Sequence, residues 1–302
     1  MSPEINPTRT LAGQIAVVTG GGRGIGRAIA QALAAAGAAV AVLSRSADEL
    51  DRTVALIESA GGKAQAYVAD ITNAPAVRNS FSEIRSTLGA IDLLVNDAGA
   101  IGPLGPFWEN DMDAWWRAMD VNLRGLLLCT HAVLPEMISR RRGRIINVSS
   151  GAGTAPIANL SSYVAAKTAL IRFTENLAAE TKPRGVSVFA IAPGTVRTAM
   201  AEYSANSEEG QKWIPWFRRL FDEGIAVPPE RAAQLVIALA SGIADVLTGR
   251  FISVMDDLNL ILENAAEVEK ESLYCLRVRK LAAEKPNPVY ANLLAVAGRG
   301  TS

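Results

Sequence analysis

Two side chains with complementary proton chemistry, Tyr163 and Lys167, lie four residues apart, and Ser150 lies thirteen residues before the tyrosine. A step of four residues places Tyr163 and Lys167 on one face of a helix. A free tyrosine has a pKa of about 10, and a neighbouring lysine cation together with a positively charged ring bound nearby would lower the pKa of Tyr163. Tyr163 could then donate a proton to a carbonyl oxygen that Ser150 also polarises. Taken alone, the pair is better explained as two ordinary helix residues.

A glycine-rich turn near the N-terminus, with glycines at Gly20, Gly24 and Gly26, is a candidate phosphate site. It follows an apolar run and precedes an alanine-rich helical pattern, which is the context that makes such a turn meaningful. Glycine permits close approach of phosphate oxygens to the backbone, and a helix N-terminus offers free N–H groups to them. The turn therefore predicts a dinucleotide site, although tight turns also use glycine for steric reasons alone.

Charged residues near this turn indicate which dinucleotide is preferred. Arg23 lies at the start of the helix, where a cation is unfavourable unless it is solvated or meets a bound anion. Ser44 and Arg45 follow the second apolar run, where an enzyme that prefers NAD(H) usually carries an acidic residue. An arginine can instead grip a 2′-phosphate, so we expect NADP(H) rather than NAD(H). Asp70 is either a turn residue or a hydrogen-bond partner of the adenine.

Short apolar runs alternate with longer helical patterns along residues 1–257. Runs without polar alternation are typical of strands buried on both faces, and this order predicts an α/β fold with a Rossmann-like, doubly wound parallel sheet of about seven strands. The expected strands are 15–19, 39–43, 64–69, 91–95, 144–148, 186–191 and 251–254. The expected helices are 24–36, 47–60, 75–88, one or two within 111–139 with Pro135 ending or kinking the last, 161–181 and 229–240. Residues 258–302 form a C-terminal extension, with an amphipathic helix or helix pair over 258–281 and a loose tail at 298–302.

Composition narrows the classes of partner. The chain has 30 basic and 30 acidic residues, so no overall charge favours nucleic acid or an anionic membrane, and the cluster Arg140–Arg144 is interpreted as a solvated helix end. No apolar run is long enough to span a bilayer, and the first nine residues lack a signal core. Two distant cysteines favour a reducing, cytoplasmic location, and the single histidine, His131, argues against a metal site.

These motifs occur together in an order that resembles the short-chain dehydrogenases/reductases over residues 11–255. The turn, Asn96-Asp97-Ala98-Gly99, Asn122, Ser150, Tyr163, Lys167 and Pro193-Gly194 carry the resemblance. It implies a catalytic tetrad of Asn122, Ser150, Tyr163 and Lys167, in which Asn122 holds a relay water and Lys167 also binds ribose hydroxyls. It further implies that Val196 and Thr198 lie near the carboxamide of the nicotinamide. The implied cofactor contacts are Gly20, Arg23, Gly24, Ile25, Gly26, Ser44, Arg45, Asp70, Ile71, Asn96, Ala98, Gly99, Tyr163, Lys167, Pro193, Gly194, Val196 and Thr198.

Three features depart from the family pattern or extend it. Asp97 stands where the family usually has a second asparagine, and the C-terminal extension either caps the active site or remodels a subunit interface. Aromatic residues between 198 and 228 either favour an apolar carbonyl substrate or anchor a surface helix; they are Tyr203, Trp213, Trp216, Phe217 and Phe221. Trp108, Trp115 and Trp116 are expected to pack within the helices before Asn122.

The leading hypothesis is an NADP(H)-dependent oxidoreductase that interconverts a small ketone or aldehyde with an alcohol, as a homodimer or homotetramer built through the helices near 122–141 and 161–181. A second hypothesis is a nucleotide-binding sensor of the same fold, which would be expected to have a broken tetrad. A third is a non-redox lyase or epimerase, which would be expected to have a degraded glycine turn. The complete tetrad and intact turn favour the first.

Overall fold

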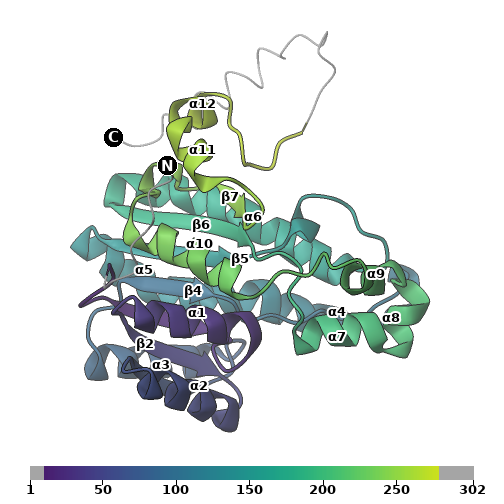
Figure 1. Cartoon of the computed structure of the whole chain (residues 1–302), viewed down its shortest axis with the longest axis horizontal. Helices are drawn as coiled ribbons and strands as arrows, with labels where there is room; N and C mark the ends of the chain where they lie inside the picture. The colour runs from purple at the N-terminus through teal and green to yellow at the C-terminus, as the bar shows by residue number, and fades with distance from the viewer. Residues whose placement is uncertain (1–9, 279–302) are drawn as a thin grey trace.

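The computed structural model describes residues 10–278. Within this range seven parallel strands form one sheet in the order β3-β2-β1-β4-β5-β6-β7, which confirms the predicted fold class (Figure 1). The strands are β1 Ile15–Thr19, β2 Ala39–Ser44, β3 Lys63–Val68, β4 Leu93–Asn96, β5 Gly143–Val148, β6 Val186–Ala192 and β7 Phe251–Ser253. The order reverses between β1 and β4, and a crevice for a ligand forms at such a reversal, beyond the carboxyl ends of the strands.

Two helical layers cover the sheet. One face carries α1 Gly24–Ala35, α2 Ala47–Ser59 and α10 Glu230–Ser241, and the other carries α3 Ala74–Thr87, α5 Leu126–Arg140 and α6 Ser161–Thr181. The helix α4 Met112–Met119 joins α5 through a π-helical turn, Asp120–Gly125. Pro135 does not end α5, which continues to Arg140. Short 3₁₀ turns occupy Phe107–Glu109, Gly151–Gly153, Lys182–Arg184 and Asp245–Leu247.

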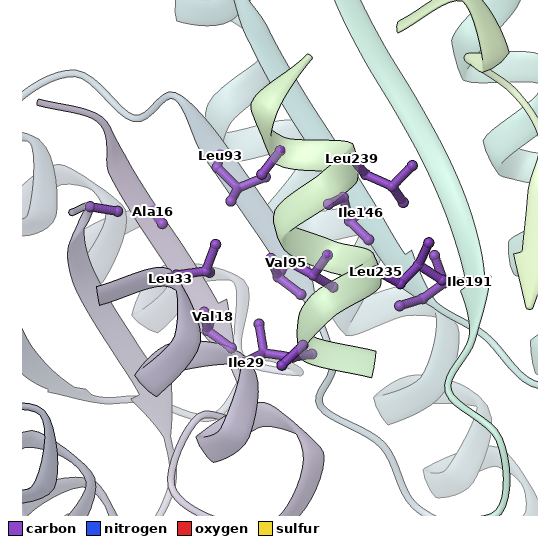
Figure 2. Close-up of a cluster of buried hydrophobic side chains, with 14 of the residues drawn as sticks. Ala16, Val18, Ile29, Leu33, Leu93, Val95, Ile146, Ile191, Leu235 and Leu239 are labelled. Carbon is purple, nitrogen blue, oxygen red and sulfur yellow. The ribbon is translucent and has the colours of Figure 1, made fainter. Parts of the chain in front are cut away.

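The core on the first face joins α1 and α10 to the central strands. Figure 2 shows Ile29 and Leu33 from α1 and Leu235 and Leu239 from α10 directed toward the strands. They meet alternate residues of the strands, among them Val18, Val95, Ile146 and Ile191. Successive strand side chains point to opposite faces, so Val17 belongs to the core of the other face. This packing holds the first turn of α1 beside the carboxyl ends of β1 and β4.

The segment after β6 forms a lid of three short helices, α7 Ala199–Asn206, α8 Glu208–Trp213 and α9 Trp216–Asp222, at the right of Figure 1. Trp213, Trp216 and Phe217 pack with Ile214 against Leu104 and Leu160. Tyr203 is half exposed and its hydroxyl donates to Glu209, while Phe221 packs edge-on against Phe217. These contacts favour the interpretation of the lid aromatics as anchors.

Two expectations about side-chain surroundings are wrong. Trp108 and Trp116 are not packed among helices: their exposed fractions are 82% and 57%. Trp115 is partly buried, and its Nε1 donates to Ser161 Oγ at 3.0 Å. The basic cluster is not simply a solvated helix end either, because Arg140 pairs with the buried Asp92 at 3.0 Å.

Arg144 of the same cluster pairs with Asp245, through Nε at 2.9 Å and Nη2 at 2.6 Å.

No helix among residues 10–278 is long and apolar enough to cross a membrane.

The extension begins with α11 Leu258–Glu263 and α12 Ala265–Lys270, whose Ile261 and Val268 join the same core as the buried residues of α10. The helix expected over 258–281 therefore ends at Lys270, since Ser272 and Tyr274 adopt left-handed backbone angles. The chain then runs along the outer edge of β7, where the Phe251 N–H donates to the Tyr274 carbonyl at 2.9 Å. The remaining predicted helix residues, Pro286, Pro288 and the tail lie outside the described residues.

Charged groups fix the end of the described chain. Glu175 on α6 accepts hydrogen bonds from the Leu276 N–H at 2.7 Å and from Arg277 Nη1 at 2.8 Å, and it also pairs with Arg172. Arg250 bonds Glu269 at 2.6 Å and Cys275 at 2.7 Å. The described extension thus covers the β7 edge and does not cap the lid side, in agreement with Figure 1.

Candidate active site

The carboxyl ends of β4 and β5 and the start of α6 bring Ser150, Tyr163 and Lys167 together. Ser150 follows β5, and its Oγ accepts the Ala152 N–H at 3.1 Å at the start of a 3₁₀ turn. Tyr163 lies in the first turn of α6 and hydrogen bonds with Ser150. The Lys167 ammonium group lies 5.6 Å from the centre of the Tyr163 ring. The three groups therefore face one space, as their spacing predicted.

In the protein without a cofactor the pKa of Tyr163 is raised, whereas the lowering expected from the sequence combined the Lys167 cation with the charge of an oxidised nicotinamide. Burial raises this pKa, and the nearby Asp97 raises it further, while the Ser150 hydrogen bond lowers it. The net shift is upward, because loss of water around a phenolate outweighs one hydrogen bond. In the protein alone, Tyr163 is therefore held as a neutral proton donor.

Lys167 is buried and directed along the end of β5. Its Nζ donates to the Val148 carbonyl at 2.8 Å, and its own carbonyl accepts from Ser149 Oγ at 3.0 Å. Burial lowers the pKa of Lys167 to about 8, while Asp97 opposes this shift. Ser149 was not predicted; its adjacency to Ser150 was the one sequence signal, and its role is to tie α6 to the end of β5.

Asn122 lies in the π-helical turn and is fully buried. Its side chain brackets the backbone of Ala100, accepting the N–H at 3.1 Å and donating to the carbonyl at 2.6 Å, and it also donates to the Ala118 carbonyl at 2.9 Å. A π-helical turn inside a helix often marks a functional site. Here the Asn122 side chain fixes the loop after β4, and its polar atoms are already engaged by backbone.

The glycine turn is packed too closely to admit side chains. Gly20 has a φ of +72°, and a Cβ there would lie 2.9 Å from the Ala98 N. A Cβ on Gly24, which has a φ of +55°, would lie 3.2 Å from Thr198 Cγ2. The turn therefore meets both the loop after β4 and the loop before the lid. Helix α1 starts at Gly24 without a side-chain cap and without an acidic residue in its first turn, as an anion site requires.

The arginines near the turn are already paired. Arg23 Nη1 lies 3.3 Å from Glu49 Oε1, and its side chain remains 65% exposed. Arg45 Nη1 lies 3.9 Å from Asp70 Oδ2, with 76% of its side chain exposed. Both are long, exposed side chains that can re-orient at little cost. Glu49 was not predicted, since it lies 26 residues from Arg23 and only the fold brings them together.

Asp70 acts as a turn residue in the structure. One carboxylate oxygen accepts the Thr72 N–H and the Thr72 hydroxyl, both at 2.8 Å. Burial alone would raise the pKa of Asp70, but the two Thr72 hydrogen bonds and Arg45 together lower it. The second oxygen faces Arg45. The ion pair places Arg45 and Asp70 side by side at the carboxyl ends of β2 and β3.

Several predicted cofactor contacts have buried side chains. The Asn96 side chain does not face the crevice: its Nδ2 donates inside the core to Thr130 Oγ1 at 3.0 Å and to Asn147 Oδ1 at 2.9 Å. Ile71 is 6% exposed in the core, and Ile25 packs against the core on the α1 side. At Asn96, Ile71 and Ile25, a contact with the cofactor would therefore have to come from the backbone. Ser44 is the last residue of β2. The other predicted positions lie in loops beside the glycine turn or the lid: Ala98, Gly99, Pro193, Gly194, Val196 and Thr198.

No cluster of three or more potential metal ligands occurs among the described residues, and His131 is exposed on α5. Cys129 and Cys275 are both free thiols. Burial raises the pKa of Cys129 to about 12.

Comparison with known proteins agrees with this geometry. The family model of short chain dehydrogenases matches residues 14–209. A short chain dehydrogenase of Pseudocercospora fijiensis is 35% identical and aligns with 91% of this chain and 94% of that protein. Galactitol 2-dehydrogenase of Rhizobium johnstonii is 38% identical over 81% of this chain and 94% of that protein. The chain belongs to the short-chain dehydrogenase family and is an oxidoreductase that uses a nicotinamide cofactor and a small-molecule substrate.

A solved structure gives the same fold. A putative NAD(P)-dependent gluconate 5-dehydrogenase from Beutenbergia cavernae, with bound NADP at low occupancy, is 34% identical and superimposes with a TM-score of 0.72. The alignment covers 81% of this chain and 96% of that protein.

Proposed function

We propose that this chain is an NADP(H)-dependent carbonyl reductase that interconverts a ketone or aldehyde with an alcohol, with Tyr163 as the general acid and base. One observation carries the proposal. Ser150 and Tyr163 share a hydrogen bond beside the buried Lys167. They lie at the carboxyl ends of the central strands, where the glycine turn also lies. This arrangement offers a single carbonyl oxygen two hydroxyl donors, which is the requirement for accepting a hydride at the adjacent carbon.

The glycine turn and α1 have the features that a dinucleotide needs. Arg23, the residue before helix α1, does not cap the helix with its side chain, and Gly20 and Gly24 leave the backbone open where side chains would not fit. When bound, the nicotinamide supplies or accepts the hydride. Lys167 would hold ribose hydroxyls and, as a cation, would stabilise negative charge that develops on the Tyr163 oxygen. Asn122 would keep the loop Ala98–Ala100 in place beside the cofactor.

In the reduction direction, the raised pKa of Tyr163 favours the donor role. The phenol hydrogen would pass to the carbonyl oxygen of the substrate, and the Ser150 hydroxyl would stabilise the charge on that oxygen. In alcohol oxidation the same tyrosine must first lose its proton, so it depends more strongly on Lys167 and on the positive charge of the oxidised cofactor.

The preference for NADP(H) rests on charge. Ser44 leaves room where an acidic side chain would repel a 2′-phosphate, and Arg45 is exposed and held only by a 3.9 Å pair with Asp70. Arg23 is a second exposed guanidinium. The NADP in the Beutenbergia cavernae protein is consistent with this preference.

The substrate is proposed only as a small carbonyl compound or alcohol. Relatives of similar identity carry names with chemically different substrates, such as 2-(S)-hydroxypropyl-CoM dehydrogenase of Xanthobacter autotrophicus and galactitol 2-dehydrogenase. The lid aromatics anchor α8 and α9, which weakens their use as a signal for an aromatic substrate.

The proposal includes a homodimer or homotetramer and a cytoplasmic location, which the two free cysteines favour. It also includes a two-part organisation, with residues 1–257 as the catalytic unit and 258–302 as an extension, of which residues 258–278 pack on that unit. Sedimentation at micromolar concentration tests the oligomer, and a monomer would contradict it.

The decisive experiment follows NADPH and NADH consumption against a panel of ketones, aldehydes and sugars. We expect turnover of at least one carbonyl compound, with NADPH preferred. Tight nucleotide binding without turnover would instead favour a sensor, and equal use of NADH would remove the argument from Arg45.

A further inference from the structure

Asp97 is a partly buried carboxyl group close to Tyr163 and Lys167. It follows β4 directly, and its N–H donates to Thr19 Oγ1 at 3.1 Å, as does that of Ala98 at 3.2 Å. Its carboxylate accepts a hydrogen bond from the Gly26 N–H in the first turn of α1. A Cβ on Gly26 would lie 2.7 Å from Asp97 Oδ2, so the carboxylate rests directly against the helix start.

The charged and titratable groups around Asp97 come from two helices. Helix α1 presents the Gly26 N–H, and helix α6 presents Lys167 and Tyr163, while β1 contributes only the neutral hydroxyl of Thr19. Burial raises the pKa of Asp97 to about 7, while Lys167 and the Gly26 hydrogen bond oppose the rise. Burial lowers the pKa of Lys167 to about 8, while Asp97 opposes the fall. Each group therefore favours the charged form of the other.

The start of α1 is also the proposed diphosphate site, so a bound cofactor would bring negative charge close to the Asp97 carboxylate. An added negative charge beside a carboxylate favours the neutral acid. Cofactor binding would thus raise the pKa of Asp97 above about 7, and the protein would take up protons at neutral pH. An asparagine in this position could neither support the Lys167 cation nor bind a proton.

We propose that Asp97 is a positioning residue that keeps the Lys167 ammonium group charged in the free enzyme and couples cofactor binding to proton uptake, a role that rests on the reductase function proposed above. Asp97 acts through Lys167 and touches neither the reacting carbonyl nor the hydride.

The first test is the pH profile of kcat/KM for NADPH in Asp97→Asn, because this parameter reports the ionisations of the free enzyme. Reduction needs Lys167 protonated, so activity falls as the pH rises through the pKa of Lys167. Because Asp97 raises that pKa, its removal moves the falling limb to lower pH, by roughly one unit. Thr19→Val is the matched control: it removes the acceptor of the Asp97 N–H but keeps the carboxylate. We expect Thr19→Val to lower the rate without moving the limb. A limb that stays in place in Asp97→Asn would overturn the proposal.

The second test needs no turnover. Calorimetric titration with NADPH at pH 7.5, in buffers of different ionisation enthalpy, counts the protons taken up on binding. We expect the wild-type protein to take up a larger fraction of a proton than Asp97→Asn, since any contribution from the ligand phosphate is common to both. Equal uptake overturns this inference and leaves the reductase standing, whereas absence of NADPH binding overturns both.

Discussion

The Lys167 ammonium group lies 5.6 Å from the Tyr163 ring centre and donates its hydrogen bond to the Val148 carbonyl at the end of β5. Lysine and tyrosine are therefore coupled through space, and not by a direct hydrogen bond. The geometry leaves the Tyr163 hydroxyl to Ser150 and to a substrate. The Ser150 hydroxyl, the Tyr163 hydroxyl and the Lys167 cation can therefore be tested by separate substitutions.

Replacing Tyr163 with phenylalanine should remove the proton donor and keep the ring. We expect kcat for carbonyl reduction to fall by roughly 10²–10⁴-fold, the range for loss of a general acid. NADPH binding, followed by the quenching of tryptophan fluorescence, should change little. A Tyr163→Phe variant with full activity would show that another group donates the proton.

Replacing Arg45 with alanine should weaken the binding of NADPH far more than that of NADH. Loss of a charged hydrogen bond to a phosphate costs about 1.5–3 kcal/mol, which corresponds to a rise of roughly 10- to 100-fold in the KM for NADPH. Arg52, exposed on α2, offers a matched control with the same loss of charge. Parallel changes for both cofactors would show that Arg45 does not contact the 2′-phosphate.

Replacing Glu175 with glutamine should loosen the end of the described chain. The Glu175 side chain is 9% exposed and holds Arg172, Arg277 and the Leu276 N–H. Loss of its charge should lower the free energy of local opening by about 1–3 kcal/mol, seen as faster hydrogen exchange in residues 271–278. Glu180→Gln, on the exposed side of the same helix, should leave that exchange unchanged. If both variants exchange at the same rate as wild type, Glu175 does not anchor the extension.

The two cysteines should differ in reactivity. Cys129 is fully buried and its pKa is raised to about 12, so below that pH it stays a protonated thiol shielded from solvent. Iodoacetamide at pH 8 should therefore modify Cys275, which is partly exposed, and leave Cys129 unmodified until the protein unfolds. Mass spectrometry of the native and the denatured protein distinguishes the two. Modification of native Cys129 would show that the α5 face opens readily.

Much of the fold was predictable because it depends on local pattern. Continuous apolar runs such as 15–19 and 186–191 are typical of strands buried on both faces, and their alternation with helices predicts a doubly wound parallel sheet. The spacing of Tyr163 and Lys167 likewise predicts a shared helix face.

Other features depend on residues that are distant in sequence. Arg23 meets Glu49 only after α1 and α2 pack together, and Trp108 is exposed because its loop crosses the surface without a covering element. The upward shift of the Tyr163 pKa depends on burial, which a spacing of four residues does not reveal. The left-handed residues Ser272 and Tyr274, neither a glycine, end the helical pattern of the extension without a sequence signal.

The hydrogen bond from Phe251 to the Tyr274 carbonyl has a consequence for any shortened form of this protein. A chain cut after Asp257 would lose the partner of the Phe251 N–H and uncover the outer edge of β7, and exposed strand edges readily pair with strands of other molecules. By covering this edge, the extension would prevent aggregation through β7. A shortened protein would therefore precipitate more readily even if its catalysis were intact.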